Sequence, residues 1–123
     1  MSVVLVDDTP DIRLLLRLLV DGHDRFEVVG EAENGAEAMK IVDRLKPDLV
    51  VLDLAMPKMD GFEVLGEMCA VSPDTSVVVL SGFEESIAAS KALEAGAAAY
   101  FEKGSDMQGL VQVLVALSSA DGA

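Results

Sequence analysis

"VVLDLAMPKMDG", residues 50–61, starts as an apolar strand, places an aspartate where the strand should end, and then breaks at a proline. A parallel strand that is buried on both faces reads as a nearly continuous hydrophobic run. Residues 49–54 follow that pattern except at Asp53. A carboxylate in this position needs a specific physical reason, and the rest of the sequence has to supply it.

The composition predicts one domain of ordinary size. The chain has 123 residues, of which 51% are hydrophobic, and this is enough to bury a core. No apolar run approaches the roughly 18 residues that span a bilayer, and "MSVVLVDD" has no basic segment like that of a secretory signal. The single cysteine, Cys69, cannot form an internal disulfide, which agrees with a reducing compartment. We therefore expect a cytoplasmic protein with no membrane contact.

The charge is strongly acidic, with 9 basic against 22 acidic residues and a net charge of −13. Such a charge repels phosphate backbones and anionic membranes, so direct nucleic-acid contact by this segment is not expected. Concentrated carboxylate also suggests a cation site, although most of the excess fits a solvated surface. The positions of the acidic residues must decide between these two interpretations.

Apolar runs alternate along the chain with helical patterns. The runs predict strands at 3–6, 26–33, 49–53, 75–81 and 97–102, and the patterns predict helices at 10–22, 34–46, 61–71, 84–96 and 106–119. Regular alternation favours an α/β fold with a parallel sheet, right-handed crossovers and helices on both faces. We expect one domain over residues 1–118, followed by a small, polar tail or linker stub at 119–123.

Capping residues and helical spacing predict how the helices begin, end and face the sheet. Thr9 is a candidate N-cap with Pro10 at the first helical position, and Gly96 is expected to close the fourth helix. The predicted inner-face residues are Ile12, Leu15, Leu16 and Leu19 in the first helix, Ala38, Ile41 and Leu45 in the second, and Phe62, Leu65 and Met68 in the third.

Polar residues gather at the carboxyl ends of the predicted strands, which is where open parallel sheets bind ligands. These residues are Asp7 and Asp8 after the first strand, Asp53 in the third, Ser81 in the fourth, and Glu102 and Lys103 in the fifth. Asp7, Asp8 and Asp53 with Lys103 leave two excess negative charges, which a divalent cation would cancel. Hard oxygen ligands without cysteine or histidine point to magnesium. The alternative is that each aspartate merely caps a helix or a turn.

Four motifs now resemble those of the receiver domain of bacterial two-component response regulators. They are "VDD" at the end of the first strand, "VLDLAMPKMDG" around Asp53, "LSG" after the fourth strand and "YFEKG" after the fifth. The resemblance covers nearly the whole chain and implies a flavodoxin-like, doubly wound, five-stranded parallel sheet with strand order 2-1-3-4-5 and five helices. "VVGEAENGAEAM" and "LKPDLVVLDL" are most similar to regulators that carry a helix-turn-helix output domain, which implies transcription regulation.

The resemblance also implies roles for individual residues. Asp53 is expected to take a phosphoryl group from a phosphohistidine of a sensor histidine kinase or phosphotransfer protein, forming an aspartyl phosphate. Such a domain catalyses its own phosphorylation and slow dephosphorylation but does not turn over an external substrate. The remaining roles implied are Mg²⁺ binding by Asp7, Asp8, Asp53 and the backbone carbonyl of Ala55, phosphoryl binding by Ser81 and Lys103, and switching by Ser81 and Tyr100.

The expected output is a change in the surface formed by the fourth helix, the fifth strand and the fifth helix. That surface would control an output domain or protein partner, or would form a homodimer. One departure from the family is expected to slow phosphorylation, and two further residues are expected to lengthen the life of the aspartyl phosphate. Gly104 follows Lys103 where receivers usually have a proline, and Ala55 and Phe83 occupy positions that influence how water reaches the phosphoryl group.

Three other functions remain as alternatives. An aspartyl phosphatase or phosphomutase would normally have a second aspartate two residues after Asp53, but this chain has Ala55. A flavin or nucleotide binder would want a glycine-rich loop after the first strand, where "DDTPD" stands instead. The strongest alternative is a protein-interaction module with a receiver-like fold that works without phosphorylation.

Overall fold

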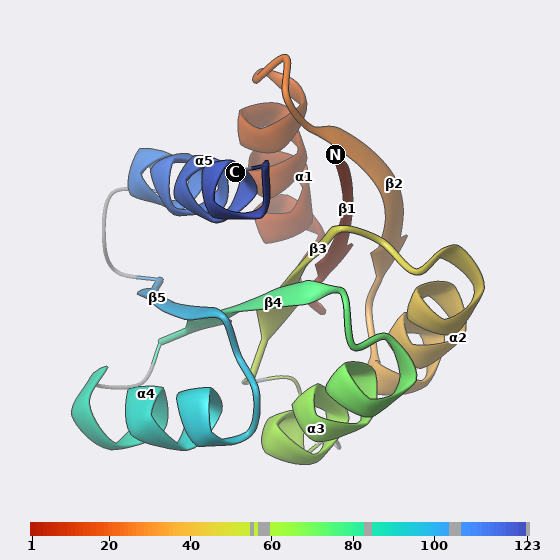
Figure 1. The fold of residues 1–123 in the computed structure, drawn as a ribbon, viewed down its shortest axis with the longest axis vertical. Coiled ribbons are helices and arrows are strands. Elements are labelled where there is room, and N and C mark those ends of the chain that lie inside the picture. The colour runs from red at the N-terminus through yellow and green to blue at the C-terminus, as the bar shows by residue number, and fades with distance from the viewer. Residues whose placement is uncertain (55, 57–59, 83–84, 104–106, 123) are drawn as a thin grey trace.

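The computed structural model describes residues 1–54, 56, 60–82, 85–103 and 107–122 and contains one parallel sheet (Figure 1). The strands, in chain order, are β1 (Ser2–Val6), β2 (Glu27–Ala32), β3 (Leu49–Asp53), β4 (Ser76–Ser81) and β5 (Ala99–Glu102). The helices are α1 (Pro10–Asp21), α2 (Gly35–Leu45), α3 (Gly61–Val71), α4 (Glu85–Glu94) and α5 (Gln108–Gly122). The strand order is β2-β1-β3-β4-β5 and every pairing is parallel, so the predicted doubly wound fold is confirmed.

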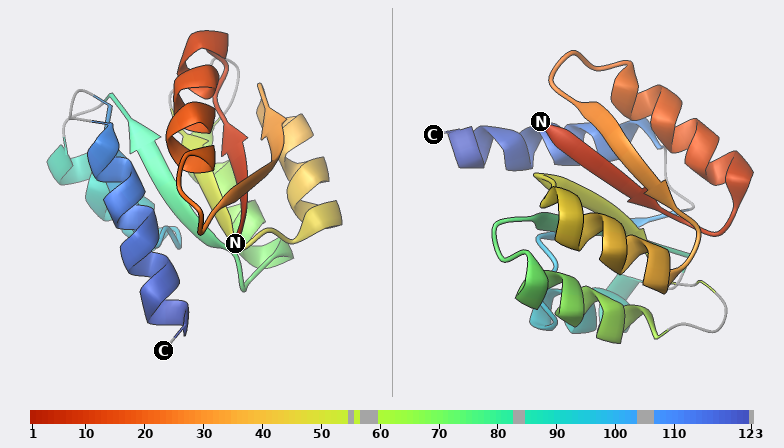
Figure 2. Two further views of the ribbon diagram at one scale, coloured as in Figure 1. Left: turned by 90° about the horizontal axis from the view of Figure 1, so that it is seen from above. Right: turned by 90° about the vertical axis from the view of Figure 1, so that its right-hand side faces the viewer.

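Helices cover both faces of the sheet, with α1 and α5 on one face and α2, α3 and α4 on the other (Figures 1 and 2). Side chains alternate along each strand, so β3 sends Val51 to the first face and Leu52 to the second. Leu49 to Leu52 are fully buried, as expected for a central strand. Asp53, the last residue of β3, is therefore the one charged residue in an otherwise apolar strand.

The orientation of α1 differs in part from the prediction. Leu16 is buried as predicted, but Leu15 is 40% exposed and Val20 is buried in its place. The apolar residues of this helix cover so much of its circumference that their spacing leaves the rotation undetermined. In the structure Nη1 of Arg17 lies 2.5 Å from Oε2 of Glu31 on the edge strand β2, so that side of the helix faces the sheet edge.

A similar correction applies to α2, whereas α3 agrees with its pattern. In α2, Ala38 and Val42 are buried and Ile41 packs partly buried against the same core. Leu45, the last residue of the helix, is 40% exposed. Leu45 is more exposed because no further helical turn follows it. In α3 the predicted residues all contact the core, with Leu65 and Met68 buried and Phe62 partly buried.

The helix ends follow local chemistry. Oδ1 of Asp60 accepts hydrogen bonds from the backbone N–H groups of Phe62 and Glu63, which caps α3. Gly96 follows α4 with a φ of +113°, a conformation that favours glycine. α5 continues through Gly122, so residues 119–122 of the predicted tail are helical, and the domain boundary at 118 stays a prediction. None of the helices in the described ranges is both long and apolar enough to cross a membrane.

Candidate functional site

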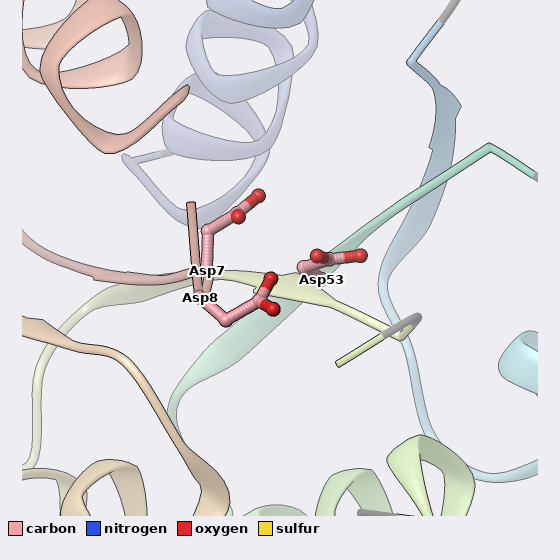
Figure 3. A group of neighbouring side chains, drawn as sticks. All are labelled: Asp7, Asp8 and Asp53. Atoms are coloured by element: carbon pink, nitrogen blue, oxygen red, sulfur yellow. The ribbon is translucent and has the colours of Figure 1, made fainter. Parts of the chain in front are cut away.

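Three carboxylates meet where β1 and β3 end (Figure 3). Asp7 and Asp8 directly follow β1, and Asp53 is the last residue of the neighbouring strand β3. One carboxylate oxygen from each lies within 4.8 Å of the others. Asp7 is fully buried, Asp53 is 1% exposed and Asp8 is partly exposed. Two of the three charges are therefore withdrawn from water, and the third stays in partial contact with it.

Backbone contacts hold Asp7 in this position. Its N–H donates to the carbonyl of Ala32, which extends the β1–β2 ladder by one residue, with an N···O distance of 3.1 Å. Its Oδ1 accepts a hydrogen bond of 2.9 Å from the N–H of Thr9. The predicted cap at Thr9 is correct in position only, because the Thr9 side chain makes no capping hydrogen bond to α1. The turn is instead closed by the aspartate side chain.

Lys103 bridges the two buried carboxylates. Its Nζ lies 3.0 Å from Oδ2 of Asp53 and 3.2 Å from Oδ2 of Asp7. The backbone N–H of Lys103 donates to the carbonyl of Ser81 at 2.8 Å, which fixes the lysine to the end of β4. Burial by itself would lower the pKa of Lys103, but its hydrogen bond to Asp53 and the charges of Asp53 and Asp7 outweigh this effect and raise the pKa above its ordinary value.

One oxygen of this cluster has no hydrogen bond. Oδ2 of Asp7 is buried and meets the geometry of no hydrogen bond within the described part of the chain, and its charged partner is the ammonium of Lys103 at 3.2 Å. Asp7 shares this ammonium with Asp53, so one positive charge serves two buried carboxylates. One lysine among three carboxylates also leaves an excess of negative charge. The all-oxygen donor set of Asp7, Asp8 and Asp53 fits a small, hard divalent cation, which would satisfy this oxygen and balance the charge.

Ser81 and Tyr100 lie on the two strands next to this cluster. Ser81 ends β4 and is fully buried, one residue beyond Leu80, which pairs with Asp53. Tyr100 lies in β5 and packs partly buried against the core on the α2–α3–α4 face. The structure thus brings together Asp7, Asp8, Asp53 and Lys103 and places Ser81 at the same sheet edge. Ala55, Phe83 and Gly104 lie outside the described residues, so the expectations about them stay predictions.

Arg13 is a neighbour of the site that sequence reasoning missed. Its Nη1 donates a hydrogen bond of 2.7 Å to the backbone carbonyl of Asp7. No sequence signal marks this contact, because the acceptor is a backbone atom that every residue type provides. The pattern of α1 alone would place Arg13 on an ordinary polar face of the helix.

Comparisons with known proteins agree with this geometry. The family model described as "Response regulator receiver domain" matches residues 3–115. The chemotaxis protein CheY of Listeria monocytogenes is 39% identical over 103 residues, which are 84% of this chain and 86% of that protein. The uncharacterized transcriptional regulatory protein YhcZ of Bacillus subtilis is 39% identical over 112 residues, which are 91% of this chain and 52% of that protein. This chain thus spans about half the length of the transcriptional regulators among its relatives.

Solved structures show the same architecture. A LuxR-family two-component response regulator from Aurantimonas sp. SI85-9A1 superposes with a TM-score of 0.88 at 33% identity, covering 96% of this chain and 85% of that one. The response regulator domain of Thermotoga maritima CheB superposes with a TM-score of 0.85 at 28% identity, covering 100% of this chain and 97% of that one. Together with the match over residues 3–115, these similarities show that the chain belongs to the receiver domain family of two-component response regulators.

Proposed function

We propose that this domain accepts a phosphoryl group on Asp53 from a phosphohistidine of a sensor histidine kinase or phosphotransfer protein. One observation carries the proposal: Asp53 is a buried carboxylate that faces both a lysine ammonium at 3.0 Å and two further carboxylates. Phosphoryl transfer requires little besides an aligned nucleophile and neutralisation of charge on the phosphoryl oxygens. The cluster offers both.

Magnesium is the cofactor that this cluster fits. Asp7, Asp8 and Asp53 would hold the ion, and the backbone carbonyl of Ala55 is expected to join them. Oδ2 of Asp7, which is buried without a hydrogen bond, supports this assignment, as do the oxygen-only ligands. When bound, the ion would neutralise charge on the transferring phosphoryl group.

Each residue of the site would have a separate role in phosphoryl transfer. A carboxylate oxygen of Asp53 attacks phosphorus in line with the phosphorus–nitrogen bond to the donor histidine. The new phosphorus–oxygen bond forms as the phosphorus–nitrogen bond breaks, and the bonding electron pair returns to the imidazole. The ammonium of Lys103 and the hydroxyl of Ser81 bind phosphoryl oxygens, and burial of Asp53 limits the access of water.

The product would act through its charge. A phosphoryl group adds about −1.5 to −2 charges and strong acceptor oxygens at the end of β3. Ser81 would move toward those oxygens, and Tyr100 would respond on β5, changing the surface formed by α4, β5 and α5. That surface would control an output domain, a protein partner or a homodimer. The names of the transcriptional regulators among the relatives support a transcriptional output.

Intact mass measurement tests this function. The wild-type protein, incubated with acetyl phosphate and magnesium, should gain the mass of one phosphoryl group, and Asp53→Asn should gain nothing while it keeps its fold. Asp48→Asn, which removes the carboxylate next to the start of the same strand, is the matched control and should be labelled like the wild type. A folded wild-type protein that gains no mass would favour the alternative of an interaction module independent of phosphorylation. Full labelling of Asp53→Asn would reject Asp53 as the acceptor.

A further inference from the structure

Arg13 contacts the site at a single backbone atom. Its Nη1 donates to the carbonyl oxygen of Asp7 at 2.7 Å. That oxygen belongs to the peptide group that links Asp7 to Asp8, the two acidic residues after β1. A charged donor makes a stronger hydrogen bond than a neutral one, and the Arg13 side chain is only 18% exposed, so water competes weakly for this contact.

The Asp7–Asp8 peptide is thereby held from both sides. Oδ1 of Asp7 accepts from the N–H of Thr9 and closes the turn, while Arg13 fixes the carbonyl. Because a peptide group is planar, rotating its carbonyl changes ψ of Asp7 and φ of Asp8 together. When the two angles do not compensate each other, the Cα–Cβ bond of Asp8 turns and its carboxylate is redirected. Holding the carbonyl therefore holds the direction of a side chain that Arg13 itself does not contact.

Arg13 is in turn held by Glu31. Its Nε lies 3.4 Å from Oε1 of Glu31, whose Oε2 lies 2.5 Å from Nη1 of Arg17. Glu31 belongs to β2 and pairs with Leu5 of β1, so the support for Arg13 comes from a rigid strand next to the site. Both arginines bind the same glutamate from the same helix, but the structure gives only Arg13 a bond to Asp7.

We propose that Arg13 is a positioning residue that sets the direction of the Asp8 carboxylate for binding a divalent cation. The cation part rests on the proposed function, whereas the clamp on the peptide is independent of it. Simple electrostatics predicts the opposite effect, since a positive charge near the cluster repels a metal ion. The sign of the change in metal affinity on removing Arg13 therefore separates positioning from charge.

The test compares Arg13→Gln with Arg17→Gln. Both variants remove one positive charge from α1 and one partner from Glu31, but only the first removes the bond to Asp7. We expect Arg13→Gln to weaken magnesium binding, measured by calorimetry, by about tenfold, as is typical when a group that orients a ligand is lost. Arg17→Gln should bind magnesium at least as tightly as the wild type. At saturating magnesium, phosphorylation of Arg13→Gln by acetyl phosphate should reach the wild-type rate, because the substitution lowers only the fraction of protein that has magnesium bound.

A measurement without metal tests the clamp itself. Amide hydrogen exchange of Asp8 and Thr9, followed by NMR without magnesium, should be faster in Arg13→Gln than in Arg17→Gln. Compared with Arg13→Gln, Arg13→Lys should keep part of the magnesium affinity, because an ammonium can donate to the Asp7 carbonyl but lacks the second nitrogen with which Arg13 contacts Glu31. If Arg13→Gln folds poorly, Arg13→Lys carries the test, because magnesium binding in this variant as tight as in Arg17→Gln would overturn the proposal.

Two results would overturn the proposal. One is magnesium affinity in Arg13→Gln equal to or higher than in Arg17→Gln, and the other is unchanged exchange of the Asp8 and Thr9 amides. If the wild-type protein binds no magnesium, the proposed function fails and the cation part of this inference fails with it. The exchange comparison would still show whether Arg13 holds the peptide.

Discussion

The central strand β3 has an aspartate next to each end, and the two serve opposite purposes. Asp48, just before the strand, is exposed, and its Oδ2 accepts hydrogen bonds from the N–H and the hydroxyl of Ser2 at 2.8 and 3.1 Å. Asp53, at the other end, is buried beside two more carboxylates and one lysine. Neutral donors of a neighbouring strand satisfy Asp48, whereas the surroundings of Asp53 leave unbalanced charge. The first arrangement stabilises the fold and the second favours a ligand.

The lysines at the two ends of the sheet repeat this contrast. Nζ of Lys46, just before β3, donates to the carbonyl of Val71 at the end of α3 and lies 3.1 Å from Asp43 in an exposed ion pair. Lys103 pairs with two carboxylates that are almost completely buried. Residue type alone therefore does not mark the site. Burial and the number of like charges nearby do.

The largest expected effect is the loss of Lys103. Lys103→Met should slow phosphorylation by acetyl phosphate about 100-fold, because a preorganised charge that stabilises the transferring group is removed. Lys46→Met, the control at the other end of β3, should react at the wild-type rate. The rate is read from the mass gain with time at saturating magnesium. Equal slowing of both variants would show that the two ends of the sheet do not differ in this way.

The next largest effect concerns magnesium affinity, which should depend on some aspartates more than on others. Asp8→Asn is expected to weaken magnesium binding more than tenfold and Asp7→Asn less, since a direct ligand matters more than a carboxylate that binds partly through water. Asp48→Asn should leave the affinity unchanged. Calorimetric titration of the four proteins makes the comparison. Wild-type affinity in Asp8→Asn would reject this division of roles.

For the stability of the fold we expect the opposite ranking, with Asp48 more important than Asp53. Asp48→Ala removes the acceptor of two hydrogen bonds and should lower the free energy of unfolding by about 1 kcal/mol. In metal-free buffer Asp53→Asn should lose less stability than Asp48→Ala, because relief of the repulsion among buried carboxylates offsets the lost ion pair with Lys103. Urea denaturation with a chelator present provides both values. A clear loss of stability in Asp53→Asn would mean that this carboxylate supports the fold.

The smallest effect concerns pH. The pKa of Lys103 is higher in the folded protein than its ordinary value of 10.5, so above pH 10.5 the native state holds more protons than the unfolded state. The stabilisation from protonated Lys103 should be complete below that pH and should disappear as the pH rises through the folded pKa. Urea denaturation between pH 9 and 12 should show a steeper fall for the wild type than for Lys103→Met. Parallel curves would contradict the role of its ion pairs.

The site could be predicted from the sequence because each of its residues lies at or just after the end of a recognisable strand. Each strand is a recognisable apolar run, and parallel strands place the residues that follow them at one edge, so Asp7, Asp8, Asp53 and Lys103 had to meet once the strands were recognised. The order of the strands did not follow from alternation. It came from the resemblance to a known family, and the sheet confirms it.

What the sequence could not predict depends on contacts between distant elements. In the structure the arginines of α1 contact Glu31 on β2, and from the helical spacing alone Leu15 looks as suitable for the core as Val20. The bond from Arg13 to a backbone carbonyl leaves no trace in residue types. Threonine is a common N-cap residue, but the Thr9 side chain makes no capping hydrogen bond. The side chain of Asp7 instead accepts a hydrogen bond from the backbone N–H of Thr9 and closes the turn.

A magnesium titration followed by NMR tests the central claim most directly. In uniformly ¹⁵N-labelled protein, we expect added magnesium to shift the amide signals of Asp7, Asp8 and Asp53 and to leave those of Asp48 and Ser2 unchanged. Asp60, which caps α3 from an exposed position, serves as a second acidic reference. Shifts that spread evenly over these aspartates, or none at the ends of β1 and β3, would show that the buried cluster is no more a metal site than the acidic surface around it.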